Sequence, residues 1–265
     1  MDVVTVKEAD SPLLVSFPHS GTYVPRAITQ HFTPTGKRLV DTDWHVPKLY
    51  DFVRELAVST VTANYSRYVI DVNRSAQGTA LYPGQSETEL CPTSTFGKKP
   101  IYLANKVPDV EEIVRRKNDY WQIYHDALAA QLTRIKKIHG YALLWDAHSI
   151  ASEVPRFFHG VLPDLNLGTA GGQSCDSRLS ADLFTVMRSS DYSAIHNGRF
   201  KGGYITRQHG TPNSGVHAVQ MEISQNTYLL ASSDYDYDYD SIKANQLSQL
   251  LKKMILVMLD YSPNH

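Results

Sequence analysis

The sequence predicts an α/β protein built around a sheet of buried strands. Segments with the apolar spacing of a helix alternate along the chain with short apolar segments that are typical of strands. The clearest case is a long predicted helix, 109–140, which is followed after a short turn by the apolar segment 141–146. This succession of helix, turn and buried strand is the pattern of βαβ units.

Composition narrows the class of protein and its partners. The 265 residues show no repeat and no linker, so we expect one domain over 1–265. A hydrophobic content of 42% and a charged content of 20% are those of a soluble protein. A net charge of −1 argues against a nucleic-acid partner, and no apolar run approaches the roughly 20 residues that cross a membrane. The oligomeric state stays open.

The cellular compartment is predicted from the N-terminus and the cysteines. The first residues lack the basic and apolar regions of a signal peptide. Cys91 and Cys175 stand alone and far apart, which fits a reducing cytoplasm better than a disulfide-stabilised scaffold.

The first half of the chain is expected to hold three strands and one helix. Asp41 or Asp43 could cap the helix at its N-terminus. Residues 75–105 are rich in Gly, Pro, Ser and Thr, and a loop of that length is usually functional or mobile. The predicted strands are 13–17, 58–65 and 67–72, and the predicted helix is 41–56.

The second half continues the alternation after the long helix. Gly140, the last residue of the segment 109–140, suits the position just after the final helical turn. The acidic tract 234–240 lacks the glycine and the final glutamate of an EF-hand loop, which indicates a solvated loop. The other expected elements are an irregular stretch 151–176, helix 177–190, strand 192–198, a glycine-rich loop 200–215, strand 216–224 and helix 239–261.

Polar side chains collect where the predicted strands end. Ligands of open α/β sheets bind at the carboxyl ends of the strands, so these side chains are candidates for one shared site. They are His19 after 13–17, Asn73 and Arg74 after 67–72, Asp146, His148 and Ser149 after the apolar run 141–145, and Glu222 beside Gln220 within 216–224.

Two of these residues suggest a metal site. Imidazole is the commonest metal ligand, and His19 and His148 occupy similar positions after apolar runs, although each could be structural. Asp43 is either the third ligand or a helix cap. Asp146 is either a carboxylate that orients His148 or a residue that caps a turn.

Three residues suggest substrate binding and proton transfer. Arg74 is either a surface charge or, with Asn73, a bidentate clamp for a carboxylate. Glu222 would be costly if buried without a partner, and a role as a base acting on metal-bound water explains it better.

Other chemistries find less support. Ser20 and Ser149 each adjoin a histidine, but the chain has no GxSxG motif, so serine catalysis is disfavoured. The glycine-rich stretch GRFKGGYITR carries Arg199, Lys201 and Arg207. It is either an anion-binding loop or a plain turn with basic residues.

Eight short motifs, in order from about residue 12 to 260, resemble N-formylglutamate amidohydrolases, also called N-formylglutamate deformylases, of histidine degradation. Each motif is weak alone, and their order makes the resemblance specific. They are FPHSG (17–21), DTDWHVPKLYDF (41–52), SRYVIDVNR (66–74), LYPGQ (81–85), LLWDAHSI (143–150), PDLNLGT (163–169), GRFKGGYITR (198–207) and GVHAVQMEIS (215–224).

The resemblance implies a fold and a reaction. The family belongs to the zinc-carboxypeptidase-like group, which implies three layers, with a mixed, mostly parallel sheet and helices on both faces. It implies hydrolysis of N-formyl-L-glutamate to formate and L-glutamate with one divalent metal ion, zinc. The implied partner is a small dianionic N-acyl amino acid, which needs at least two cationic contacts, so one or more of Arg199, Lys201 and Arg207 would complement Arg74.

The resemblance also implies roles for individual residues. His19 and His148 match the group's metal-binding histidines, Asn73 and Arg74 its carboxylate clamp, and Glu222 its base. One position departs from the pattern, because Thr22 stands where the group has a metal-binding glutamate. We expect Asp43 to replace that ligand.

Two alternative functions stay open on the sequence. The first is a metal-dependent deacylase that acts on another N-acyl amino acid. The second is a non-catalytic small-anion binding protein that has lost its metal, for which Thr22 is the main argument.

Overall fold

A seven-stranded sheet forms the centre of the computed structural model, which describes residues 1–78, 86–230 and 237–263. The strand order is β1-β3-β2-β4-β7-β5-β6. Strands β3, β2, β4 and β7 run parallel, whereas β1 is antiparallel to β3 and β5 is antiparallel to β7. The strands are β1 (Val4–Lys7), β2 (Leu13–Phe17), β3 (Ser59–Ala63), β4 (Ala142–Ile150), β5 (Leu165–Gly168), β6 (Ala194–His196) and β7 (Val216–Ser224).

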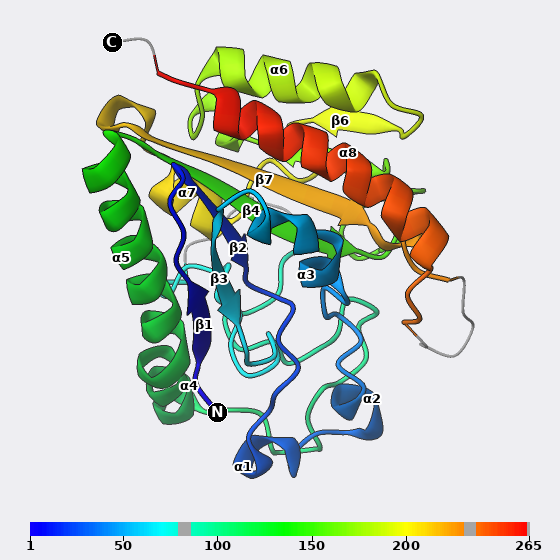
Figure 1. Cartoon of the computed structure of the whole chain (residues 1–265). Helices are drawn as coiled ribbons and strands as arrows, with labels where there is room; N and C mark the ends of the chain where they lie inside the picture. The colour runs from blue at the N-terminus through cyan, green and yellow to red at the C-terminus, as the bar shows by residue number, and fades with distance from the viewer. Residues whose placement is uncertain (79–85, 231–236, 264–265) are drawn as a thin grey trace.

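Helices cover both faces of this sheet (Figure 1). Helices α5 and α7 pack on one face, and α3, α6 and α8 pack on the other. The expected α/β fold, with a mixed and mostly parallel sheet between two helical layers, is therefore confirmed. The helices are α1 (Arg26–Thr29), α2 (Pro34–Lys37), α3 (Val46–Leu49), α4 (Val110–Arg116), α5 (Gln122–His139), α6 (Ser177–Arg188), α7 (Tyr204–His209) and α8 (Ser241–Asp260).

The long predicted helix is stabilised by a capping residue at its start, a glycine at its end and an apolar stripe that packs on the sheet. The Asp109 carboxylate accepts a hydrogen bond from the backbone N–H of Glu112, and Gly140 ends the helix in the left-handed conformation with φ 83°. Tyr124, Leu128, Leu132 and Ile135 are buried against the sheet. Each such side chain contributes roughly 1.5–3 kcal/mol by leaving water. The prediction missed a π-helical turn, Lys117–Trp121, between α4 and α5.

The two longest strands carry polar side chains on one face, at their carboxyl ends. Leu144 of β4 and Ala218 of β7 pack beneath α5. Successive side chains of a strand point to opposite faces, so Asp146 and His148 continue the face of Leu144. Residues Gln220 and Glu222 of β7 lie opposite Asp146 and His148 in the register. The apolar face under α5 thus becomes polar where the parallel strands end.

Two predicted elements of the first half are wrong. Segment 67–72 is a turn and not a strand, because the Asp71 carboxylate closes it by accepting bonds from Arg67 and from the backbone N–H of Asn73. Segment 41–56 is not one helix: His45 has φ 58°, so α3 is short and is followed by a 3₁₀ turn, Asp51–Arg54.

The second half follows the prediction more closely. The expected helices 177–190 and 239–261 and the strands 192–198 and 216–224 are present as α6, α8, β6 and β7. The irregular stretch 151–176 contains the missed strand β5, and the glycine-rich loop 200–215 contains helix α7. The missed strand β1 lies at the edge of the sheet.

Parts of two predictions concern segments outside the described residues: the motif 81–85 and most of the acidic tract 234–240. Within the described ranges, none of the helices combines the length and the apolar character needed to cross a membrane.

Candidate metal and substrate site

A cavity lies at the carboxyl ends of β2, β4 and β7, where the polar face of the sheet is exposed to it. The side chains that line it come from all three strand ends and from the loops that follow β3 and β6. They include His19, Asp43, Arg67, Asp71, Asn73, Arg74, His148, Arg199, Gln220 and Glu222. The structure thus brings together most of the residues that the sequence singled out.

Three buried side chains form a group that could hold a metal ion. One ligand atom each from His19, Asp43 and His148 lies within 4.8 Å of the other two. Nδ1 of His148 is 3.1 Å from Oδ2 of Asp43, and Nδ1 of His19 is 3.8 Å from the same oxygen. The side chains of all three residues are at most 4% exposed.

Neighbouring segments place Asp43 beside the two histidines. His19 follows directly on the end of β2, and its carbonyl accepts a 3.0 Å hydrogen bond from the backbone N–H of Asp43. Gln225 holds the same segment from the other side by donating to the carbonyl of Thr42. The interpretation of Asp43 as a helix cap is wrong, because His45 is the N-cap residue of α3 and no side chain caps that helix.

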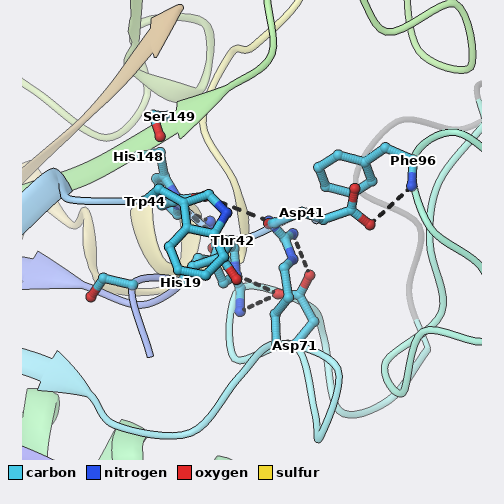
Figure 2. Close-up of polar contacts among 12 residues, drawn as sticks. His19, Asp41, Thr42, Trp44, Asp71, Phe96, His148 and Ser149 are labelled. Atoms are coloured by element: carbon cyan, nitrogen blue, oxygen red, sulfur yellow. Dashed lines mark hydrogen bonds and ion pairs between the residues drawn. The ribbon is translucent and has the colours of Figure 1, made fainter. Parts of the chain in front are cut away.

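The imidazole of His19 is oriented by a carboxylate behind it (Figure 2). Its Nε2 lies 2.7 Å from Oδ1 of Asp71, and Nη2 of Arg67 donates to Oδ2 of Asp71 over 2.7 Å. Burial and the charge of Arg67 lower the pKa of His19, while His19 and Arg67 overcome burial and hold the pKa of Asp71 well below its usual value. With Nε2 donating to Asp71, the lone pair of Nδ1 faces Asp43.

His148 is also held through its Nε2, which has two partners. This atom is 3.0 Å from Oδ2 of Asp146 and 3.0 Å from Nδ2 of Asn73, and Ser16 donates to the other oxygen of the Asp146 carboxylate over 2.9 Å. Burial lowers the pKa of His148, but the carboxylates of Asp146 and Asp43 outweigh burial and raise that pKa well above its ordinary value. The same negative charges favour any cation bound at this point.

These donors fit a divalent metal ion. Two imidazole nitrogens and one carboxylate oxygen are a donor set that zinc accepts, and three protein ligands leave a coordination position open. Each histidine also has a carboxylate at its second nitrogen, which is the usual support for a metal-bound imidazole. His19, Asp43 and His148 are therefore the residues that would hold the ion.

Glu222 faces the same cavity from β7, opposite His148 in the sheet register. Gln220 donates a 3.2 Å hydrogen bond to Oε2 of Glu222. Burial raises the pKa of Glu222 to about 8; the charge of His148 opposes this rise and that of Asp43 adds to it. A carboxyl group with a pKa near neutrality can both accept and return a proton.

The two serines that adjoin histidines have other partners. Ser20 donates to the carbonyl of Phe17, and Ser149 is hydrogen-bonded to Tyr228 and Gln225. Within the described residues, neither hydroxyl is hydrogen-bonded to a histidine ring, so the structure gives serine catalysis no support.

Cationic side chains approach the cavity from two loops. Arg74 lines it, and within the described part of the chain its Nε is buried without a hydrogen-bond partner. Arg199 also lines it and donates from Nε to the carbonyl of Phe157. Lys201 and Arg207 are not among the described residues that line the cavity. Both are exposed, and Nε of Arg207 donates to the carbonyl of Gly202.

The close approach of Asn73 explains why position 203, in the stretch GRFKGGYITR, is a glycine. The backbone N–H of Gly203 donates to the side chain of Gln220, and a Cβ at this position would come within 2.6 Å of Oδ1 of Asn73. We expect Gly203→Ala to displace Asn73. Given the role in a carboxylate clamp that is predicted for Asn73, the substitution should reduce kcat/KM by about 10-fold or more, because a misplaced binding group loses much of its effect. Steady-state kinetics would check this, with Gly97→Ala as the control, since a Cβ there meets only Thr95 at 3.7 Å.

Arg67 and Asp71 line the cavity but are not among the site residues predicted from the sequence. Both lie in the segment 67–72, for which the apolar centre predicts a strand. The available signal was the spacing of opposite charges at positions i and i+4 around three apolar residues, in the segment that ends at Asn73.

The geometry agrees with comparisons to known proteins. The model of the N-formylglutamate amidohydrolase family matches residues 11–229. N-formylglutamate deformylase of Pseudomonas aeruginosa is 44% identical to this chain, and that of Pseudomonas putida is 43% identical; each alignment covers 96% of both chains. The crystal structure of N-formylglutamate amidohydrolase from Ralstonia eutropha JMP134 superimposes with a TM-score of 0.83 at 22% identity, over 98% of both chains. The chain is an amidohydrolase and belongs to the N-formylglutamate amidohydrolase family.

Proposed function

We propose that this protein hydrolyses N-formyl-L-glutamate to formate and L-glutamate and depends on a divalent metal ion, zinc. The observation that carries the proposal is the buried group of His19, Asp43 and His148, which shares one cavity with Glu222 and Arg74. The relatives at 44% and 43% identity bear the name of this activity. We also propose that the protein acts in the cytoplasm, in the degradation of histidine.

The protein side of the mechanism starts with the ligands. His19, Asp43 and His148 would hold the ion, and Asp71 and Asp146 keep the two imidazoles oriented for it. When bound, the ion supplies a Lewis acid that polarises the formyl oxygen and lowers the pKa of a bound water.

Glu222 performs the proton transfers. Its carboxylate takes a proton from the attacking water and gives it to the amide nitrogen, which leaves as the amine of glutamate. Burial raises the pKa of Glu222 to about 8 in the metal-free site, and the charge of a bound cation would lower that pKa toward neutrality, where a carboxyl group can both accept and return a proton. Gln220 orients the carboxylate through the hydrogen bond to Oε2.

The substrate carboxylates need two cationic partners. Arg74, next to Asn73, binds one of them, and Arg199 on the opposite loop binds the other. Arg199 is preferred to Lys201 and Arg207 because it alone of the three is among the described residues that line the cavity.

Removing either arginine should weaken substrate binding. We expect Arg74→Ala and Arg199→Ala each to lower kcat/KM by about 10- to 150-fold, mainly through KM, because a hydrogen bond to a charged group contributes about 1.5–3 kcal/mol. Steady-state formate release measures this. Lys201→Ala is the matched control on the same loop and should change kcat/KM less than about threefold. An unchanged KM in Arg199→Ala, or a large effect in Lys201→Ala, would refute this assignment.

Formate release from N-formyl-L-glutamate, compared with the N-acetyl and N-formyl-L-aspartate analogues, tests the substrate. A preference for an analogue would favour the alternative deacylase. A non-catalytic anion-binding protein is disfavoured because the chain belongs to an amidohydrolase family.

A further inference from the structure

Two aromatic side chains outside the cavity hydrogen-bond to the backbone next to Asn73; they lie on the π-helical turn Lys117–Trp121 and on the first turn of α5. Nε1 of Trp121 donates a 2.9 Å hydrogen bond to the carbonyl of Arg74. Nε2 of His125 lies 2.7 Å from the carbonyl of Val72 and must carry a proton, because a carbonyl oxygen only accepts. The two hydrogen bonds thus fix the backbone carbonyls on either side of Asn73. π-Helical turns are frequent at functional sites.

The two donors are held rigidly by their own packing. The rings of Trp121 and His125 lie 3.9 Å apart, centre to centre, and both residues are 6% exposed. Tyr204 of α7 packs edge-on against His125. Burial lowers the pKa of His125 to about 4, so its ring is neutral at neutral pH.

The segment 72–74, which these hydrogen bonds hold, belongs to no helix or strand. Residues 72–74 form a turn, in which the N–H of Asn73 donates to Asp71 over 2.9 Å. The N–H of Ile205, in α7, donates to Oδ1 of Asn73 over 2.8 Å. Backbone carbonyls in such a turn keep their direction only if partners from the surrounding structure hold them, and Trp121 and His125 are these partners.

We propose that Trp121 and His125 are positioning residues that hold Asn73 and Arg74 in the geometry that binds a substrate carboxylate. Neither is among the described residues that line the cavity, so both act through the backbone at residues 72 and 74. The inference rests on the proposed function, because it presumes that Arg74 binds a carboxylate of the substrate.

The variants Trp121→Phe and His125→Phe remove one donor each and keep an aromatic ring. We expect each to raise KM for N-formyl-L-glutamate about 3- to 10-fold, in keeping with the loss of one hydrogen bond, and to change kcat less than about twofold. His125→Gln, whose amide can still donate to the carbonyl of Val72, should restore most of the affinity. Tyr141→Phe is the matched control, because it removes an aromatic donor to a distant carbonyl, that of Tyr261.

Two substrate analogues separate positioning from general damage. N-formyl-L-glutamine lacks the side-chain carboxylate, and N-formyl-L-isoglutamine lacks the α-carboxylate. The KM of one analogue should be unaffected by Arg74→Ala. That analogue is the one that lacks the carboxylate bound by Arg74. The KM penalty of Trp121→Phe and His125→Phe should disappear with the same analogue.

The results distinguish failure of this inference from failure of the proposed function. Absence of formate release by the wild-type enzyme would refute the proposed function. If the wild type is active, a KM unchanged by both substitutions, an equal penalty on all three substrates, or a loss confined to kcat would overturn the positioning role. Thermal unfolding of each variant gives the folded fraction, to which kcat is normalised.

Discussion

Replacing Glu222 by glutamine should lower kcat by about 10²- to 10⁴-fold and leave KM within about threefold of the wild-type value. Proton transfer by a positioned carboxylate contributes a factor of this size, and glutamine has the same shape but cannot accept the proton of the attacking water. Glu222 lies on β7 opposite His148, whereas the two arginines proposed to bind the substrate lie on loops outside β7, so the substitution should leave them in place. Steady-state formate release and calorimetric binding of L-glutamate measure the two effects.

A control and a metal assay make the Glu222 experiment decisive. Glu111→Gln removes an exposed carboxylate on α4 that is not among the described residues lining the cavity, and it should leave kcat unchanged. The metal content of Glu222→Gln should equal that of the wild type, because the ligands are elsewhere. Near-normal turnover in Glu222→Gln at full metal content would eliminate Glu222 as the base.

Removal of the metal should abolish activity and lower the thermal unfolding temperature. An ion bound only by the folded state stabilises it by about 4 kcal/mol at a free concentration 1,000 times the Kd. A bound ion would also balance the buried carboxylate of Asp43. Dialysis against a chelator, followed by elemental analysis, calorimetry and the formate assay, measures both effects, and added zinc should restore them.

One substitution tests whether Asp43 is a ligand of the ion. Asp43→Asn keeps the size of the side chain and removes the charge of the third ligand, so we expect metal affinity to fall by at least about 10-fold. Thr22→Ala is the control, because Thr22 is exposed and is not among the described residues that line the cavity. A chelated, metal-free enzyme with full activity would contradict metal dependence, and unchanged metal affinity in Asp43→Asn would contradict this ligand.

Most of the sheet and its helices could be predicted because they depend on local patterns. The apolar stripe of α5, its N-cap at Asp109 and its end at Gly140 are all visible in one stretch of sequence, and the structure has them. Segment 67–72 failed for the opposite reason. Its apolar centre has the composition of a strand, but the ion pair of Arg67 with Asp71 closes it into a turn.

The α/β class, the elements around the apolar runs, and the candidate histidines and carboxylates are all predictable from the amino-acid sequence. Which of these side chains meet depends on the packing of the folded chain. Asp43 reaches His19 and His148 because a backbone hydrogen bond docks its loop on the end of β2, and Arg199 is chosen over Lys201 by its place on the cavity wall. Hydrophobic periodicity is local and survives in the sequence, whereas the approach of side chains about a hundred residues apart depends on how strands and loops are packed together.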